Sequence, residues 1–489
     1  MIKILPRIWG ERVKGEAVGL PSRGHRANMA SRGGIRVMRA GEEIVAVVGS
    51  VFLMAATACG MDYDVVILDP NAACVAVSDG QQAGNVTVVG ADTLRYQHAV
   101  IWSDAKQGRV DLNPEGCLTS QVWDAAGGRQ VGIGDHHALL WADTRESVID
   151  LNPGDCGYSC AYGIWDRWQV GVGISGTVGE HALLWSGAAD SVVDLHPAGF
   201  VVSRAGGVWG RRQVGYGVPL EGDDVDWRAL LWFGTRESVV DLHPAGFRWS
   251  CACDTWGTWQ VGSGVPVDGG DMQALLWSGT ADSVVNLHPE GYRWSYVVRC
   301  WGGRQVGVGD DHALLWSGSA QSVVDLHRFV PGEYTYSGAF GIDSTGRIAG
   351  YVGNDSGRRA VVWVPRSAPV YQCWSVRQSA CLYTTDGAEV ERLLMDPNAW
   401  TFEGTLCHVP PDSLDPNAMP VYRFKARDGL ARFYTIERDE RDKFFRDQRE
   451  KWICEGIAFY AYRPSRRPAS AIAVHRFRSD SPNRYLYTR

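Results

Sequence analysis

The sequence predicts a mainly β protein: a seven-bladed β-propeller closed by an N-terminal strand, followed by a small α+β repeat module. Two observations predict the propeller. A short apolar segment, "HALLW" or a close variant, recurs seven times at spacings of 39 to 47 residues, and in six cases a segment such as "SVVDLHP" follows it. Such a period is typical of propellers, solenoids and arrays. The repeated segments end in Trp102, Trp141, Trp185, Trp232, Trp277, Trp316 and Trp363.

Each repeat contains four short strands. In 203–244 these are "SRAGGVW", "RQVGYGV", "RALLW" and "ESVVDLHP", separated by Gly, Pro and Asp turns. Four strands in about 45 residues make a propeller blade. Small residues in the first strand fit a crowded central tunnel, and the uninterrupted "ALLW" fits a strand buried on both faces, with its tryptophan packed between blades. First strands are expected near 74–78, 119–123, 159–164, 203–208, 250–255, 295–300 and 337–342.

The stretch "DVVILDPNAA", at 64–73, has the pattern of a fourth strand but follows no third strand. The seventh repeat, 337–363, lacks a fourth strand, because "VPRSAPVY" follows its third strand and does not fit the pattern. We therefore expect 64–70 to pair beside Ala360–Trp363 and close the ring, which removes two open sheet edges. The propeller then spans 62–365.

The segments "GIWDRWQVGVG", "HALLW" and "VVDLHP" resemble the bacterial extracellular HAF-type repeat across 62–365. The resemblance implies an extracytoplasmic β-propeller and assigns no catalytic residues.

Beyond the propeller, three segments resemble one another: "PVYQCWSVRQSACLYT" (369–384), "PVYRFKARDGLARFYT" (420–435) and "AVHRFRSDSPNRYLYT" (473–488). The first two precede a charged helical segment and then "WTFEGTLCHV" or "WICEGIAFYA". This predicts two complete β-β-α-β units and an incomplete third over 369–489. The pattern resembles DUF5648, which implies a carbohydrate or cell-wall attachment role. The third unit is either truncated or completed by an N-terminal strand.

Residues 1–58 are predicted to be a signal or targeting segment, because basic residues precede the apolar run 44–60. A start at Met29 would make 1–28 a mis-called extension. The sequence "ATAC" fits cleavage near Cys59, which would carry lipid if the site is a lipobox. We thus expect an extracellular or cell-surface protein, with the periplasm and outer membrane as alternatives. In such an oxidising compartment Cys373 and Cys381 are candidates for a disulfide.

Four tryptophans are the candidate ligand-binding residues. They follow the first strand in four successive blades, so the symmetry of a propeller places them in an arc near one tunnel mouth. Exposed indoles there could stack on sugars or hold a cation; alternatively, each fills the gap between neighbouring blades. The four are Trp165, Trp209, Trp256 and Trp301.

The "DLHP" pairs, such as Asp194 and His196, are expected to stabilise turns and not to bind metal, because the pairs repeat at equivalent positions of adjacent blades, too far apart to share one ion. The loops 221–226 and 268–273 could hold Ca²⁺ but lack EF-hand spacing. No other cofactor is expected. The histidines before "ALLW" also repeat, and no GxSxG, HExxH or P-loop is present, so no catalytic residue is assigned.

Residues 59–365 hold 19 Lys/Arg and 35 Asp/Glu, a net charge of −16, which disfavours nucleic acid. The sequence favours an exported, monomeric, non-enzymatic binding protein whose partner is a surface glycan or a protein. It would touch a membrane only through a lipid anchor. The alternatives are a polysaccharide hydrolase or lyase with its site at the tunnel mouth, and a purely structural surface protein. An enzyme would need carboxylates or histidines that differ between blades and converge on that mouth.

Overall fold

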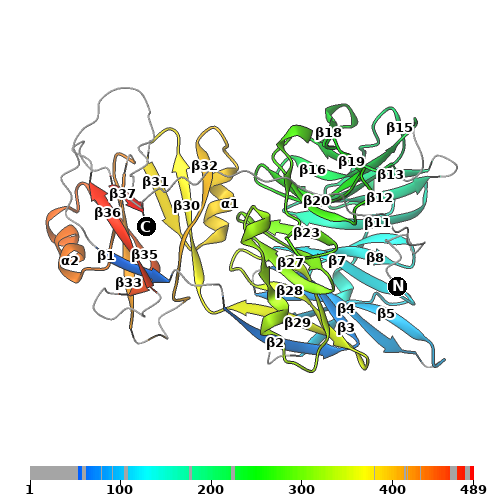
Figure 1. The fold of residues 1–489 in the computed structure, drawn as a ribbon, viewed down its shortest axis with the longest axis horizontal. Coiled ribbons are helices and arrows are strands. Elements are labelled where there is room, and N and C mark those ends of the chain that lie inside the picture. Colours follow the sequence, from blue (N-terminus) through cyan, green and yellow to red (C-terminus); the bar gives the residue numbers. More distant parts are fainter. Residues whose placement is uncertain are drawn as a thin grey trace, which may run out of the picture. The chain divides into compact units, whose positions relative to one another are not determined.

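The computed structural model describes residues 53–57, 62–78, 80–90, 92–103, 108–175, 179–221, 226–378, 380–411, 415, 417–429, 431–462, 471–478 and 485–488. Within these residues the propeller consists of seven four-stranded antiparallel sheets (Figure 1). The sheets form a ring, because the inner strands of neighbouring blades touch in succession and those of the last blade touch those of the first.

The inner strand of each blade lines the tunnel. The inner strands are β3 (Ala72–Ser78), β7 (Ser120–Ala126), β11 (Cys156–Trp165), β15 (Phe200–Trp209), β19 (Phe247–Trp256), β23 (Ser295–Trp301) and β27 (Tyr336–Ile342). The second strands are β4 (Gln81–Val89), β8 (Arg129–Gly134), β12 (Trp168–Ser175), β16 (Arg212–Pro219), β20 (Trp259–Pro266), β24 (Arg304–Gly309) and β28 (Ile348–Asn354).

The third strands carry the "ALLW" segment. They are β5 (Arg95–Ser103), β9 (His137–Trp141), β13 (Glu180–Trp185), β17 (Arg228–Trp232), β21 (Gln273–Trp277), β25 (His312–Trp316) and β29 (Gly357–Pro365). The outer strands are β6 (Arg109–Asp111), β10 (Ile149–Asp150), β14 (Val193–Asp194), β18 (Val240–Asp241), β22 (Val285–Asn286), β26 (Val324–Asp325) and, in the last blade, β2 (Tyr63–Pro70). Short 3₁₀ helices lie beside the outer strands: η1 (Arg145–Ser147), η2 (Ala189–Ser191), η3 (Arg236–Ser238), η4 (Ala281–Ser283), η5 (Ala320–Ser322) and η6 (Leu326–Phe329).

Strand β2 closes the ring as predicted. It pairs antiparallel with β29 in a register that sets Val65 opposite Trp363 and Ile67 opposite Val361. Tyr63, at the start of β2, is buried in the same hydrophobic cluster as Trp363. The last blade is therefore built from two segments nearly 300 residues apart in the sequence.

The seven repeated tryptophans pack between blades, as the sequence predicts. Six are fully buried and Trp102 is 6% exposed. Trp185 shows the pattern: it packs with Leu140 and Leu151 of the preceding blade and with Ile164 of its own blade. Burial of this much aromatic surface in each gap is a main source of the stability of the ring.

A buried serine links six of the seven blades to the blade before them. Ser203, at the inner strand, accepts a hydrogen bond from Ala182 N of the preceding blade at 3.0 Å, and its Oγ lies 2.8 Å from His196 Nδ1. Asp194 completes the turn by accepting a bond from His196 N at 2.8 Å. The "DLHP" residues thus stabilise a turn between blades, as predicted. The same bond from alanine to serine recurs at Ser120, Ser159, Ser250, Ser295 and Ser337.

The C-terminal module forms a nine-stranded sheet with two helices. Its first unit contains β30 (Ala368–Ser375), β31 (Ala380–Thr384), α1 (Gly387–Leu394) and β32 (Trp400–Val409). The second contains β33 (Ala418–Ala426), β34 (Arg432–Thr435), α2 (Arg438–Asp447) and β35 (Trp452–Tyr462). The third contains only β36 (Ala471–Arg478) and β37 (Tyr485–Thr488) among the described residues. Asp386 begins α1 by capping the N–H groups of Ala388 and Glu389.

Each helix of the module is tied to the next unit by an ion pair. Glu389 of α1 accepts two hydrogen bonds from Arg423 of the second unit, at 2.8 and 2.9 Å. Glu440, at the equivalent position of α2, accepts bonds from Arg476 of the third unit at 2.8 and 3.0 Å. Bidentate pairs of this kind fix orientation as well as adding energy, so they set the stacking of successive units.

Strand β1 (Leu53–Thr57) joins the sheet of the module by pairing along its length with β36, from Leu53 opposite His475 to Thr57 opposite Ala471. Completion by an N-terminal strand was one of two alternatives that the sequence left open for the third unit, and β1 is such a strand. The strand also lies inside the predicted targeting segment, whose remaining residues lie outside the described part of the chain. Cleavage near Cys59 would remove β1, so the two roles exclude each other in one mature chain.

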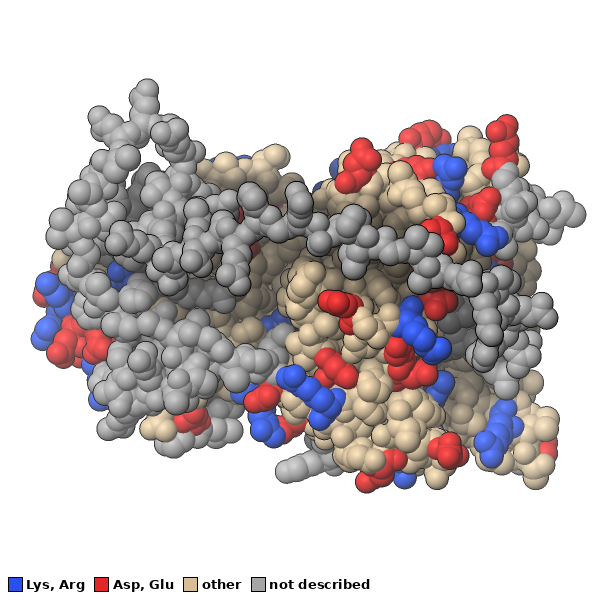
Figure 2. All heavy atoms as spheres, viewed as in Figure 1, with Lys and Arg blue, Asp and Glu red and all other residues tan. Residues whose placement is uncertain are grey.

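On the face shown in Figure 2, acidic and basic side chains are interspersed over the propeller, without a large patch of one sign. Among the residues described, no helix is both long and apolar enough to cross a membrane.

Candidate ligand site at the tunnel mouth

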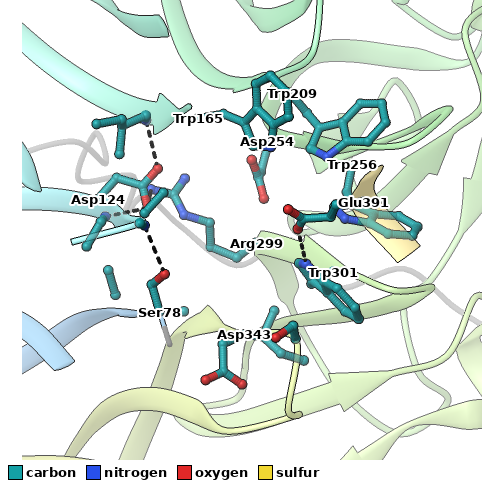
Figure 3. Close-up of a pocket in the computed structure, with 18 of the residues that line it drawn as sticks. Ser78, Asp124, Trp165, Trp209, Asp254, Trp256, Arg299, Trp301, Asp343 and Glu391 are labelled. Carbon is teal, nitrogen blue, oxygen red and sulfur yellow. Dashed lines mark hydrogen bonds and ion pairs between the residues drawn. The ribbon is translucent and has the colours of Figure 1, made fainter. Parts of the chain in front are cut away.

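A cavity of about 630 Å³ opens at one mouth of the tunnel, where the inner strands end. Its walls come from inner strands of all seven blades, and residues of helix α1 lie against it (Figure 3). A cavity of this size is suited to a small organic ligand. Its chemistry is set by two positions of the inner strand, the last residue and the residue two places before it.

Near that end, every inner strand carries a β-bulge. In β19 the register shifts between Ala252 and Asp254, and in β15 between Ala205 and Gly207. The shift brings neighbouring backbones so close that a Cβ at Gly207 would lie 2.7 Å from Asp254 Cα. Small residues are therefore the rule at this bulge position, with charged exceptions in three blades. Around the ring it holds Ala76, Asp124, Gly163, Gly207, Asp254, Arg299 and Gly341.

Asp124 and Arg299 form an ion pair across the tunnel. Arg299 Nη2 lies 3.3 Å from Asp124 Oδ1 and donates to Trp123 O at 3.1 Å. Asp124 also accepts bonds from the backbone N–H groups of Ala125 and Ile164 at 2.9 and 3.0 Å. Burial is the largest influence on the pKa of Asp124 and raises it, although Arg299 opposes the rise. The pair is thus held by three blades at once.

Asp254 has no ion pair within the described residues. Its Oδ2 accepts a hydrogen bond from Cys300 N at 2.9 Å. Burial raises the pKa of Asp254 from 3.8 to about 6, and the charge of Arg299 opposes this rise without cancelling it. The carboxyl is therefore mainly ionised at pH 7 and becomes protonated in mildly acidic solution.

The last position of the inner strand forms the rim of the mouth. Four adjacent blades present the predicted tryptophans, whose neighbouring ring centroids lie 5.8, 6.1 and 5.2 Å apart. In two of the other blades the strand ends in Ser78 and Ala126, and in the third Asp343 directly follows β27. Asp343 closes a turn by accepting bonds from Thr345 N and Arg347 N at 2.9 and 3.0 Å. The rim is thus aromatic on one side and small or polar on the other.

The indoles form the predicted arc, but most of them are not exposed. Trp209, Trp256 and Trp301 are 5, 3 and 8% exposed, and only Trp165 is half-buried. They pack on one another, and residues of the C-terminal module cover them: Phe402 lies 5.0 Å from the Trp256 ring. All four nevertheless line the cavity, so as ligand-binding residues they remain a prediction.

Helix α1 contributes a further carboxylate. Glu391 Oε1 accepts a hydrogen bond from Trp301 Nε1 at 2.7 Å, and Ala388 and Met395 of the same segment also line the cavity. Nearby, Tyr371 OH donates to Ser344 O at 2.9 Å. Figure 3 shows the carboxylates of Asp254 and Glu391 both directed into the cavity.

The remaining predicted metal candidates do not form a site. No group of three or more metal-ligating side chains occurs within the described ranges. Histidines at the start of third strands pair with outer-strand aspartates, as His181 does with Asp194 at 3.0 Å. In the loop 268–273, Asp268 accepts a bond from Gly270 N at 3.3 Å. Residues 222–225 of the other candidate Ca²⁺ loop lie outside the described residues.

The predicted disulfide between Cys373 and Cys381 is wrong, since both thiols are free. The register pairs Cys373 with Leu382 and Cys381 with Trp374, so the two side chains leave opposite faces of the hairpin. Accordingly, the two cysteines belong to different hydrophobic clusters. Cys59, the candidate for lipidation, lies outside the described residues.

Asp124, Asp254 and Arg299 belong to no catalytic signature, so sequence motifs did not predict them. A signal for them was nevertheless present. Aligning the inner strands shows one position that is Gly or Ala in four blades and charged in three. A charge at a position that packing reserves for small residues indicates a role other than packing.

The fold and the cavity define a β-propeller with a ligand-sized site at one tunnel mouth. Residues 369–489 match DUF5648, a domain of unknown function, so the chain is a propeller joined to a DUF5648 domain. No curated protein matches the chain. The HAF-type likeness and a bacterial source stay predictions from the repeats.

Solved structures resemble the fold only distantly. The β-propeller domain of the Trilobed protease from Pyrococcus furiosus is 13% identical with a TM-score of 0.42, over 61% of this chain and 94% of that one. Puromycin hydrolase is 13% identical with a TM-score of 0.41, over 75% of this chain and 58% of that one, so only part of the hydrolase is matched. An oligogalacturonate lyase in complex with manganese is 9% identical with a TM-score of 0.42, over 64% and 96%. These similarities concern the fold alone.

Proposed function

We propose that the chain is an exported, non-enzymatic binding protein that holds a small polar ligand, such as a carbohydrate unit, at the tunnel mouth. The observation that carries this proposal is the cavity of about 630 Å³ with indoles on one wall and, in its lining, the carboxylate of Asp254, which has no ion pair among the described residues. An apolar wall beside a few convergent polar groups is the usual composition of a small-molecule site. A surface glycan or a protein that displays such a group is the expected partner.

The test uses the half-buried member of the arc, because removing a buried indole would also disturb packing. Trp165→Phe keeps an aromatic ring but removes part of the cavity wall. We expect it to weaken binding of glycan-array ligands by about three- to tenfold, the share of one partly exposed aromatic contact. The matched control is Trp249→Phe, since Trp249 is also half-buried but belongs to an aromatic cluster with Trp227 outside the cavity.

Binding that both variants reduce equally would place the ligand elsewhere. If the wild type binds no small ligand at all, the alternative of a purely structural surface protein replaces the proposed binding function.

One observation favours a second candidate, a polysaccharide hydrolase or lyase. Asp124, Asp254 and Arg299 differ between blades and converge on the tunnel, which is the arrangement that an enzyme needs. The raised pKa of Asp254 would suit a proton-transfer group. Release of reducing ends or unsaturated products from polysaccharides, abolished by Asp254→Asn, would establish this function. Release that Asp254→Asn leaves unchanged would exclude the site.

A further inference from the structure

We propose that the ligand of the tunnel-mouth cavity is a small organic cation, a compound that carries an amino or quaternary ammonium group. This inference rests on the proposed binding function and names the chemical class of its ligand. Three features carry it: a carboxylate without an ion pair among the described residues, an arginine that is paired with another carboxylate, and an aromatic wall.

Asp254 is the first feature. It lies in the wall of the cavity, is ionised to a large extent at neutral pH, and has no ion pair among the described residues. Leaving a charge in such a site costs free energy unless a partner compensates it. The fold itself does not need the carboxylate, because Gly or Ala occupies the same bulge position in four other blades. A ligand cation would supply the missing partner.

Arg299 is the basic residue whose charge acts on Asp254, but its bonds go to other groups. Its Nη2 lies 3.3 Å from Asp124 Oδ1, and the same nitrogen donates to the carbonyl oxygens of Trp123 and Tyr162 at 3.1 and 3.4 Å. Arg299 therefore lowers the charge of the tunnel by pairing with Asp124. Asp254 remains as the inner-strand carboxylate without an ion pair among the described residues. Asp343, which directly follows β27, also lines the cavity, but it accepts the hydrogen bonds of a turn.

The aromatic wall is the third feature. Trp165, Trp209 and Trp256 line the cavity beside Asp254, and Trp256 lies two residues after it on the same strand. Indole is the side chain that attracts cations most strongly through its ring face, and the attraction grows when water is excluded. A neutral polar ligand would gain from the indoles but would leave Asp254 without a counter-charge.

The remaining charge points the same way, because acidic residues outnumber basic ones in the lining of the cavity. The acidic residues are Asp124, Asp166, Asp254, Asp343 and Glu391, and the basic ones are Arg129, Arg299 and Arg392. Glu391 adds a second carboxylate directed into the cavity, hydrogen-bonded to Trp301 (Figure 3). The stretch 59–365 carries a net charge of −16, which raises the local concentration of cations and slows the approach of anions.

The experiment compares two pairs of probes, each with one charged and one neutral member of similar shape. Choline is paired with 3,3-dimethylbutanol, and glucosamine with glucose, from which it differs in one substituent. Isothermal titration calorimetry of the full chain should show at least about tenfold tighter binding of the charged member of a pair, the preference expected from a desolvated carboxylate and indoles together.

Two variants identify the responsible group. Asp254→Asn should reduce the preference for the charged probe to less than about threefold, while Asp282→Asn, an exposed aspartate in η4, should leave it unchanged. Circular dichroism confirms that each variant is folded. If Asp254→Asn fails to fold, Glu391→Gln takes its place, with a smaller loss of preference expected.

Equal binding of the charged and neutral members would overturn the cation proposal and leave the binding function intact. Loss of preference with Asp282→Asn as well would also overturn it. If neither pair binds while the glycan array still detects a ligand that depends on Trp165, the ligand is not a cation; if the array is empty too, both proposals fall.

Discussion

Asp254 occupies a position where close packing of inner strands favours glycine, and the surrounding protein raises its pKa. Between pH 4 and 6 the folded state holds a proton on this carboxyl that the unfolded state, with a pKa of 3.8, has released. The folded state then binds more protons than the unfolded state, so the free energy of unfolding falls as pH rises through this window. Arg299, Asp124 and Cys300 are the charged or titratable groups that act on it most closely.

We predict that Asp254→Asn stabilises the protein at pH 8 by on the order of 2 to 3 kcal/mol, because Asn keeps the shape but never ionises. The gain should shrink as pH falls and vanish below about pH 4, where the wild-type carboxyl is protonated in both states. Urea unfolding at pH 4, 6 and 8 measures this. A gain that does not change with pH would mean that the effect does not come from ionisation.

At the residue scale, the sequence predicted the site residues that recur at equivalent positions of several blades. It did not predict the charged residues that differ from blade to blade at one position. The arc of four tryptophans follows from symmetry, because equivalent positions in adjacent blades must lie side by side. The burial of Trp256 and Trp301 does not follow from it, because Phe402 and Tyr371, which cover them, come from another domain. Contacts between domains leave no periodic signal in the sequence.

At the scale of elements, the serine that links successive blades is a polar contact repeated in six blades. Ser250 Oγ accepts the bond from Ala229 N at 3.0 Å and lies 2.8 Å from His243 Nδ1. Both Ser250 and Ala229 are fully buried. A donor left there without an acceptor could not turn to water.

Ser250→Ala should therefore lower the free energy of unfolding by about 1 to 3 kcal/mol, the penalty for leaving a buried N–H unsatisfied. Ser238→Ala, which removes an exposed turn hydroxyl, should cost about 1 kcal/mol or less. Urea denaturation midpoints compare the two. Equal losses would show that the link between blades adds nothing beyond an ordinary turn.

The ion pair between helix α1 and the second unit is another element-scale contact. Arg423 and Glu389 are 13 and 18% exposed, and Glu455 lies 2.9 Å from Arg423 Nε. We predict that Arg423→Gln destabilises the module by about 3 to 5 kcal/mol, because Glu389 loses its partner while remaining largely buried and Glu455 keeps only a longer contact with Arg432, at 3.7 Å. Arg377→Gln breaks the exposed pair with Asp396 and should cost under 1 kcal/mol. Limited proteolysis of the module reports both, and similar cleavage rates would contradict the prediction.

The strands themselves were predictable because alternation and turn residues mark them. The pairing register was not predictable, and the wrong prediction of a disulfide shows why. Cys373 and Cys381 lie on neighbouring strands of one hairpin, yet a register set by one residue decides whether two side chains share a face. The turn between them, which fixes that register, carries no clear signature in the sequence.

At the scale of the whole molecule, closure of the ring by β2 follows from counting strands, and the structure confirms it. We predict that a protein lacking residues 62–70 unfolds at a lower temperature over the whole propeller and not only in the last blade, because the gap exposes Trp363 and the cluster around it. A synthetic peptide of 62–71 supplied in excess should raise the melting temperature again. Differential scanning calorimetry measures both, and an unchanged propeller transition would contradict the prediction.

The N-terminal segment poses a question that an intact-mass measurement of the mature protein answers. We predict removal of the residues before Cys59, which would also remove β1 from the sheet of the module. A mature chain that retains residues 53–57 would instead assign them to the module and end the targeting interpretation. The chain cannot keep β1 and lose its leader, because the strand lies before the predicted cut.

Closure by β2 also determines how the propeller would respond to force. The chain enters the ring at Tyr63 and leaves it at Pro365, and these two residues lie directly opposite each other in the register. A pull between an N-terminal tether and the C-terminal module would therefore act on one end of the β2–β29 pair. It would break the bonds one at a time, starting at the contact between Arg366 and Asp64. The other six blades would carry none of the load. The ring would therefore unfold as one unit on heating, but under tension it would open at the β2–β29 pair, one hydrogen bond after another.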